Sequence, residues 1–311
     1  MLLILIKCAL TNNFNADLFG RGYSDNPLDA YHDVRLYTTQ VLIALSSSPL
    51  SGWTGNNAFS LVGYSLGGGI SVAFTSYYPS LVNSLVLIAP SGILRPYHIA
   101  LSSRFLYQTE GILPESFINY LVWRRLNNNP TPISNSKTKV AMSTAAVQNA
   151  PTATRPPPSV VARPEDVVNS ELPADDPTPL FAAHPSVTVF GAVQWQIENH
   201  PGFIPAFVSA VRHGPITHEH ERWRVIGRRL TAQKAKGADS EAQVAGFEQG
   251  RVLVLLGRTD PVIVEGEVSA DAEELLGKDN LEIVSIEAGH DLPLAKSKEV
   301  VDALWKFWEE P

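Results

Sequence analysis

The stretch that decides the fold is Gly63-Tyr64-Ser65-Leu66-Gly67, in which a serine stands between two glycines. The residues ahead of it, Ala58-Phe59-Ser60-Leu61-Val62, form a short apolar run that predicts a buried strand. The residues after it, Gly68-Gly69-Ile70-Ser71-Val72-Ala73-Phe74, are small and apolar and predict a closely packed helix. A strand, a sharp turn and a helix in this order are typical of a nucleophile elbow, in which the serine hydroxyl is presented on the turn.

Apolar runs of strand length recur along the chain and alternate with helical patterns. Further strands are predicted at residues 84–88, 251–256 and 281–286, and helices at residues 33–46, 65–78, 270–276 and 298–308. Continuous apolar runs without alternation suit parallel strands that are covered on both faces. We therefore predict an α/β protein with a doubly wound, mostly parallel sheet.

The strand and helix rhythm is lost between Pro90 and about Phe247. This predicts a core at residues 1–91 and 248–311, interrupted by a cap at residues 92–247 whose helices lie within residues 92–126 and 187–230. Residues 127–180 are rich in Pro, Ser, Thr, Asn and Ala, and such a composition buries too little apolar surface to offset chain entropy. We expect most of this segment to be disordered or loosely extended.

Composition narrows the range of partners. The formal net charge of the 311 residues is −7, which argues against nucleic acid as a partner, and the one cysteine, Cys8, rules out an intramolecular disulfide. No run reaches the 18 apolar residues of a membrane span, so no integral membrane segment is expected. The apolar start is interrupted at Lys7, so we expect a buried strand there rather than a cleaved signal peptide. The localisation is expected to be cytoplasmic or is left open. The oligomeric state stays open.

A serine nucleophile needs an imidazole to accept its proton and a carboxylate to orient that imidazole. Asp260 directly follows the predicted strand at residues 251–256, and His290 follows the strand at residues 281–286. Because the carboxyl ends of parallel strands meet at one edge of a sheet, both side chains are expected beside Ser65. Glu265 and Glu267 are fallback acids. Asp291 is a weaker candidate because its side chain should diverge from its neighbour His290.

Three further motifs support a resemblance to a known family. Asp17-Leu18-Phe19-Gly20-Arg21-Gly22-Tyr23-Ser24-Asp25 resembles the D-x-x-G-x-G-x-S loop of α/β-hydrolases, Gly257-Arg258-Thr259-Asp260-Pro261 resembles their acid loop, and Ala288-Gly289-His290 resembles their histidine loop. With the elbow, these motifs cover residues 17–93 and 206–308 and resemble the epoxide-hydrolase-like esterase branch. The order Ser, Asp, His is also that of α/β-hydrolases.

The resemblance implies an acyl-transfer enzyme, because related dehalogenases and epoxide hydrolases carry aspartate at the elbow where this chain carries Ser65. Ser65 would attack an ester, thioester or similar carbonyl of a small apolar molecule, and the Leu66 N–H would stabilise the oxyanion. No cofactor is implied. Aromatic residues are expected to bind the small-molecule substrate, and these are Tyr64, Trp123, Trp195, Phe203 and Phe207, with Phe105 and Tyr107 as further candidates. Hydrolysis of a carbon–carbon bond and peptidase activity remain alternatives.

The chain departs from the family pattern ahead of Asp17. The second oxyanion donor of the family comes from a His-Gly loop after an earlier strand, and no His-Gly precedes Asp17. Either the chain is an N-terminally truncated form that lacks the first core strands, or residues 1–16 form an improvised edge strand in a catalytically impaired relative that serves as a binding protein. Asn12-Asn13-Phe14-Asn15 is a poor strand sequence, which favours truncation.

Two other motifs favour structural interpretations. His218-Glu219-His220-Glu221 lacks the histidine pair at i and i+4 that places two metal ligands on one helical face, so we expect no metal site. Gly67-Gly68-Gly69 is not followed by the lysine of a phosphate-binding loop. These glycines are better explained by close helix packing.

Overall fold

The computed structural model describes residues 3–8, 12–48, 53, 58–95, 113–127, 179–181, 183–236, 246–247 and 250–309. Residues 128–178, which make up nearly all of the segment predicted to be disordered, lie outside the described residues, as do Phe105 and Tyr107. Among the described helices, none combines the length and the apolar character that crossing a bilayer requires.

A six-stranded sheet forms the centre of the molecule, in the order β2-β1-β3-β4-β7-β8. Its strands are β1 (Leu3–Cys8), β2 (Asn12–Asp17), β3 (Phe59–Tyr64), β4 (Val82–Ile88), β7 (Val252–Gly257) and β8 (Leu281–Ile286). The four strands β3, β4, β7 and β8 are mutually parallel. The predicted mostly parallel α/β sheet is confirmed.

The first two strands form an antiparallel hairpin at one edge of the sheet. The prediction that Asn12–Asn15 would not be a strand is wrong, because these residues form the first part of β2. They pair with β1, and Asn12 lies opposite Cys8. Pairing with an apolar neighbour outweighs the low strand propensity of asparagine, which depends strongly on context. β1 is also antiparallel to β3, and Ile4 pairs with Gly63. The beginning of β1 therefore lies beside the carboxyl end of β3.

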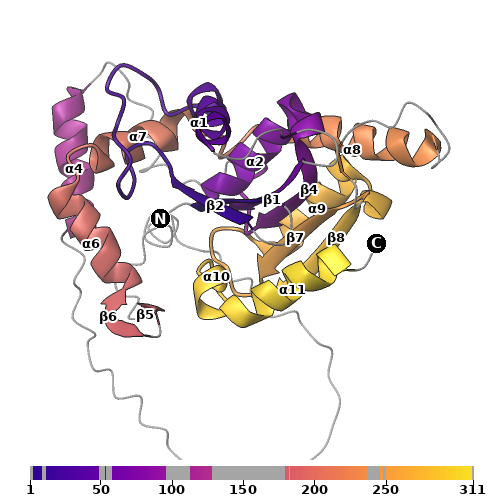
Figure 1. Cartoon of the computed structure of the whole chain (residues 1–311). Helices are drawn as coiled ribbons and strands as arrows, with labels where there is room; N and C mark the ends of the chain where they lie inside the picture. Colours follow the sequence, from indigo (N-terminus) through magenta and orange to yellow (C-terminus); the bar gives the residue numbers. More distant parts are fainter. Residues whose placement is uncertain are drawn as a thin grey trace, which may run out of the picture.

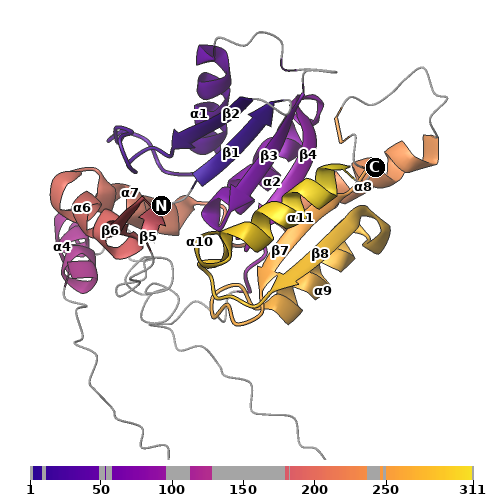
Figure 2. The same ribbon diagram turned by 60° about the horizontal axis from the view of Figure 1, so that its bottom comes forward.

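Helices cover both faces of the sheet, as Figures 1 and 2 show. One face carries α1 (Val34–Ser47), α2 (Leu66–Tyr77), α8 (His220–Lys236) and α9 (Glu265–Leu276), and the other carries α11 (Ser297–Glu309), which follows the short α10 (Leu292–Ala295). Local signals set the helix ends. Asp33 caps α1 by accepting hydrogen bonds from the Arg35 and Leu36 amides. Pro79 lies two residues after the end of α2 and opens a 3₁₀ turn (Pro79–Leu81). A second such turn (Lys278–Asn280) leads into β8.

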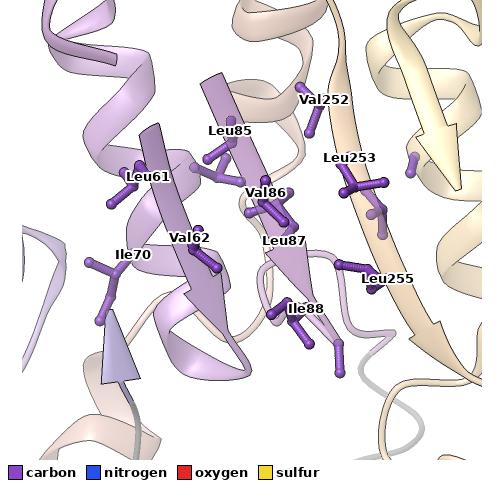
Figure 3. Close-up of a cluster of buried hydrophobic side chains, with 14 of the residues drawn as sticks. Leu61, Val62, Ile70, Leu85, Val86, Leu87, Ile88, Val252, Leu253 and Leu255 are labelled. Carbon is purple, nitrogen blue, oxygen red and sulfur yellow. The ribbon is translucent and has the colours of Figure 1, made fainter. Parts of the chain in front are cut away.

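The main hydrophobic core lies between the parallel strands and these helices. Figure 3 shows aliphatic side chains of β3, β4 and β7 packed side by side, with Ile70 of α2 beside them. Leu61, Leu85 and Leu253 are completely buried. Burying a side chain of this kind contributes about 1.5–3 kcal/mol, so these strands form a rigid base for the loops that leave their carboxyl ends.

A second cluster of elements lies at one end of the molecule (Figure 1). It comprises α4 (Glu115–Asn127), α6 (Val189–Asn199), α7 (Phe203–His213) and the hairpin of β5 (Pro179–Phe181) and β6 (His184–Thr188). The three helices share a small core of their own, centred on Ile118, Val193 and Phe207. By contrast α8, which falls inside the expected cap segment, packs against α2 and α9.

Candidate active site

The turn between β3 and α2 holds Ser65 in an unusual backbone conformation. Its φ is 53° and its ψ is −121°, values that a residue with a side chain adopts only at a cost of about 1–3 kcal/mol. The turn is also tight, since a Cβ on Gly63 would lie 2.4 Å from the carbonyl oxygen of Gly67. Ser65 precedes the first residue of α2, yet its side chain makes no capping bond to the helix. The hydroxyl is therefore available to another partner.

Backbone hydrogen bonds hold this turn against the neighbouring strand. The Ser65 amide donates to the carbonyl of Ile88 at 3.0 Å, and the Ser65 carbonyl accepts from the amides of Gly68 and Ser91 at 2.8 and 3.0 Å. Leu66 is the first residue of α2, so its N–H has no acceptor within the helix. This N–H lies at the positive end of the helix dipole, next to Ser65.

Asp260 lies just beyond the carboxyl end of β7. One carboxylate oxygen, Oδ1, accepts hydrogen bonds from the amides of Val262 and Ile263 at 2.8 and 2.9 Å, an arrangement typical of a carboxylate that organises its own loop. These bonds fix the carboxylate with its second oxygen, Oδ2, facing the histidine loop. Asp260 is the group that the sequence predicted as the acid.

His290 joins the other two residues. Its Nδ1 lies 2.8 Å from Oδ2 of Asp260, and its Nε2 lies 2.9 Å from Oγ of Ser65. Because the carboxylate accepts, Nδ1 carries the proton, and Nε2 accepts the hydroxyl hydrogen of Ser65. The exposed fractions of the three residues are only 2–6%. Water therefore competes little for these hydrogen bonds, and the arrangement is suited to withdrawing a proton from Ser65.

The loops that carry Asp260 and His290 are joined by their backbones. The Arg258 amide donates to the carbonyl of Ile286 at 2.9 Å, and the Thr259 amide donates to that of Ala288 at 3.1 Å. Gly257 permits this approach, because a Cβ there would lie 2.5 Å from the carbonyl oxygen of Gly289. The acid loop and the histidine loop are thus held at a fixed distance from each other.

Tyr64 lies at the end of β3, immediately before Ser65, and is half-buried. Its hydroxyl donates to the backbone carbonyl of His290 at 2.7 Å, and the two ring centroids are 5.4 Å apart with planes inclined by 34°. Sequence reasoning placed Tyr64 among the substrate-binding residues and missed this hydrogen bond. The partners are 226 residues apart in the sequence, and no local pattern signals such a contact.

The other aromatic residues predicted to bind substrate belong to α4, α6 and α7. Phe203 and Phe207 are buried in the core of that cluster, and the guanidinium of Arg21 lies over both rings, 5.0 and 5.8 Å from their centroids. Trp195 is 44% exposed and contacts Tyr23, and Trp123 is 39% exposed and stacks on Tyr120. These contacts are with Arg21, Tyr23 and Tyr120, and none of these is one of the three site residues.

The fallback acids have other partners. Glu265 accepts a hydrogen bond from Ser285, and Glu267 forms an ion pair with Arg95 at 3.7 Å. Asp291 is the residue before α10 and makes no capping bond.

The histidine-rich stretch at the start of α8 also has a structural explanation. Burial raises the pKa of Glu219, while its hydrogen-bonded partner Arg222 opposes that shift. In the described part of the chain no three His, Cys, Asp or Glu side chains are grouped so that they could hold a metal ion.

Comparison with known proteins gives a family match over most of the chain. The model of the alpha/beta hydrolase family matches residues 9–303. Among curated proteins, uncharacterised proteins of Mycobacterium tuberculosis and Mycobacterium bovis are 34% identical over 83 residues, which cover 27% of this chain and 22% of each relative. The match therefore spans about a fifth of the length of these relatives.

Several solved structures share the fold. An alpha/beta hydrolase from a Medee basin deep-sea metagenome library, MGS-M2, has a TM-score of 0.55 at 12% identity, covering 97% of this chain and 82% of its own. A membrane phospholipase A, described as a bacterial virulence factor, has a TM-score of 0.53 at 17% identity, covering 96% and 71%. A hydrolase from Oleispira antarctica has a TM-score of 0.51 at 12% identity, covering 97% and 83%. At these identities the similarity concerns the fold.

Proposed function

The chain belongs to the alpha/beta hydrolase family, and on that premise we propose that it is a serine hydrolase that cleaves an ester, thioester or related activated carbonyl of a small apolar molecule. The observation that carries the proposal is the unbroken series of hydrogen bonds from Asp260 through His290 to Ser65. Three buried polar groups in this order supply a carboxylate that orients the base, a general base and a nucleophile.

In the first half of the reaction, Oγ of Ser65 attacks the carbonyl carbon while Nε2 of His290 accepts the hydroxyl proton. The resulting tetrahedral intermediate collapses, and the leaving alcohol or thiol takes that proton from His290. In the second half, water attacks the acyl carbon, gives its proton to His290, and releases the acid as Ser65 recovers its hydrogen. Asp260 stabilises the imidazolium that forms twice in each cycle.

Oxyanion stabilisation falls to the Leu66 amide, which sits at the amino end of α2 and directly follows the nucleophile. A second donor usually comes from a loop that follows a strand beside β3. In the described structure that position is held by β1, which runs antiparallel to β3. Loss of one oxyanion donor typically lowers turnover by about 10²- to 10³-fold, so we expect slow turnover if Leu66 acts alone.

The position of β1 beside β3, where a second oxyanion donor would be expected, favours a second candidate function. A relative that keeps the fold but lacks efficient oxyanion stabilisation would act as a binding protein for a small apolar ligand. The two candidates differ in whether Ser65 reacts covalently, and this difference is directly measurable.

The first prediction is that a fluorophosphonate probe labels the wild-type chain and fails to label Ser65→Ala. The phosphorus centre is attacked by an activated serine, so labelling requires the Ser65–His290 hydrogen bond. Labelling is read by intact mass, and hydrolysis of p-nitrophenyl acetate, butyrate and octanoate by the same samples reports turnover and chain-length preference.

Ser71→Ala is the matched control for that experiment. Ser71 is a buried serine of α2 whose hydroxyl has no hydrogen-bond partner among the described residues, and its loss should leave labelling unchanged. A folded wild-type sample that shows neither labelling nor ester hydrolysis would refute the serine-hydrolase function. Ligand binding would then remain as the candidate function.

A further inference from the structure

The elbow and the histidine loop are held by different parts of the sheet. The elbow is fixed by backbone bonds to β4 and to Ser91, whereas the histidine loop is joined to the acid loop beyond β7. Proton transfer between Ser65 and His290 requires these two units to stay aligned within about 0.5 Å. We propose that Tyr64 is a positioning residue that aligns them by donating its hydroxyl hydrogen to the backbone carbonyl of His290. The inference rests on the proposed serine-hydrolase function.

The contacts of Tyr64 suit this role. Tyr64 is the last residue of β3 and is covalently adjacent to Ser65, so its position follows that of the nucleophile. Its hydroxyl lies 2.7 Å from the carbonyl oxygen of His290, the residue whose Nε2 lies 2.9 Å from Oγ of Ser65. Two hydrogen bonds from adjacent residues of the elbow thus reach one residue of the histidine loop. One involves its side chain and the other its backbone.

These two hydrogen bonds differ in what happens to them during the reaction. When Ser65 is acylated, Oγ is bonded to the acyl carbon and has no hydrogen left to donate to His290. The contact between Tyr64 and the His290 carbonyl involves no reacting atom and persists. In the acyl-enzyme, Tyr64 therefore keeps the imidazole in place while it accepts a proton from the attacking water. The hydroxyl of Tyr64 should matter more for deacylation than for acylation.

The ring of Tyr64 makes a separate contribution. Its centroid lies 5.4 Å from that of the His290 imidazole, within the distance over which an aromatic ring stabilises a cation. The imidazolium forms in both halves of the reaction, so the ring should assist both. Tyr64→Phe removes the hydroxyl alone, and Tyr64→Leu removes the hydroxyl and the ring. Comparing the two variants separates the two contributions.

The test uses a p-nitrophenyl ester in stopped-flow experiments, with the acyl-enzyme measured by intact mass after acid quenching. For Tyr64→Phe we expect the deacylation rate constant to fall about tenfold, and the acylation rate constant and fluorophosphonate labelling to fall less than threefold. The fraction of acyl-enzyme at steady state should rise accordingly. Tyr64→Leu should slow both steps. Tyr31→Phe, which removes a tyrosine hydroxyl from an exposed side chain, should behave like wild type.

Rescue provides a readout that a purely structural role would not give. Hydroxylamine is a stronger nucleophile than water and needs less help from a general base, so it should restore turnover of Tyr64→Phe by acting on the acyl-enzyme. Tyr64→p-aminophenylalanine keeps an N–H donor, which is weaker than a phenol O–H, and should therefore restore deacylation in water only in part. If Tyr64→Phe fails to fold, this variant is compared directly with wild type, and its weaker donor should slow deacylation more than acylation.

Equal slowing of acylation and deacylation by Tyr64→Phe, or no effect on either, would overturn the proposal. Failure of the wild type to react with the fluorophosphonate would instead overturn the serine-hydrolase function itself. The two failures are therefore distinguishable in the same set of samples.

Discussion

At the scale of single residues, the site combines a strained backbone at Ser65 with a hydrogen bond from its side chain to His290. Ser65 keeps a positive φ of 53°, and its hydroxyl is turned to His290 instead of capping α2. Both features cost stability, because an N-cap bond is worth about 1 kcal/mol and positive φ is unfavourable for a residue with a Cβ. The fold is thus locally destabilised at Ser65, the residue that the proposed chemistry requires.

Replacement of Ser65 by glycine should reveal this cost. Both Ser65→Gly and Ser65→Ala remove the hydroxyl and the proposed activity, but only glycine adopts a φ of 53° without steric penalty. We expect Ser65→Gly to have a free energy of unfolding about 1 kcal/mol higher than that of Ser65→Ala, from urea unfolding followed by circular dichroism. Equal stabilities of the two variants would show that the turn is not strained.

The three candidate site residues could be predicted because each has a local signal. Ser65 lies between glycines on a strand-turn-helix sequence, and Asp260 and His290 each follow an apolar strand. The bond from Tyr64 to His290 could not be predicted, because it depends on how two loops far apart in sequence approach each other. The packing of Phe203 and Phe207 against Arg21 could not be predicted either, because it also depends on how distant parts of the chain approach each other.

At the scale of elements, the glycines of α2 let two other stretches of chain approach the helix, one just after β4 and one just after α7. A Cβ on Gly68 would lie 2.6 Å from Cβ of Pro90, and one on Gly69 would lie 2.2 Å from the carbonyl oxygen of Pro215. These distances support the helix-packing explanation for the glycine run. They also mean that α2, which begins directly after Ser65, is closely surrounded on this side.

Substitution of two helical glycines by alanine should therefore change stability in opposite directions. Gly69→Ala forces a backbone shift and should lower the free energy of unfolding by about 1–3 kcal/mol. Gly266→Ala, in the first turn of α9, meets nothing within 4 Å and should raise it by up to about 1 kcal/mol. Thermal unfolding of both variants beside wild type measures the difference, and a loss of stability in both would contradict this account.

Element boundaries were predictable where sequence and packing agree. The strand at Leu281–Ile286 has the predicted limits, and α1 and α11 each begin within one residue of the predicted position. The helix α9 begins at Glu265, five residues earlier than predicted, with two glutamates in its first turn where the helix dipole favours negative charge. The strand β2 was missed because partner pairing decides strand formation in a sequence of low propensity.

At the scale of the whole molecule, the core and the cluster of α4, α6 and α7 meet around a buried histidine. The His32 amide donates to Oγ of Ser209 on α7 at 3.0 Å, and neither of its ring nitrogens has a hydrogen-bond partner among the described residues. Burial lowers the pKa of His32 from 6.5 to about 4, with smaller contributions from Arg21 and His213 that outweigh the opposing effect of Asp33. His32 is therefore neutral in the folded protein at neutral pH.

Acidification should weaken the fold through this residue. The unfolded chain binds a proton at His32 near pH 6.5 while the folded chain does not until about pH 4, so stability is fully present above pH 6.5 and falls as the pH drops between these values. His32→Gln should show a loss of unfolding free energy between pH 7 and pH 5 that is smaller than that of wild type by about 2 kcal/mol. Urea unfolding at both pH values measures this.

The exposed His184 of β6 provides the control for that measurement. His184→Gln should keep the pH dependence of wild type, because the side chain is in water. Parallel pH dependences of wild type and His32→Gln would show that the pKa of His32 is the same in the folded and the unfolded chain and would refute the assignment.

Which helices associate with which part of the molecule was not predictable from the order of the sequence. α8 falls between the two halves of the core in the chain, yet it packs on α2 and α9. Its association follows from close contact at Gly227, where a Cβ would lie 2.6 Å from the carbonyl oxygen of Leu275. Such a contact depends on the three-dimensional path of the chain between elements, and this path cannot be predicted from composition.

The reversed direction of β1 has a practical consequence for how the protein is handled. Because Ile4 pairs with Gly63, a segment fused ahead of β1 would emerge at the edge of the sheet that holds Ser65. The end of α11 lies at the opposite edge, since the Trp308 indole donates to Ser84 near the start of β4, and Phe307 packs under Arg251 just before β7. Purification tags and surface-immobilisation handles are therefore better attached after α11, where they leave the edge that holds Ser65 unobstructed.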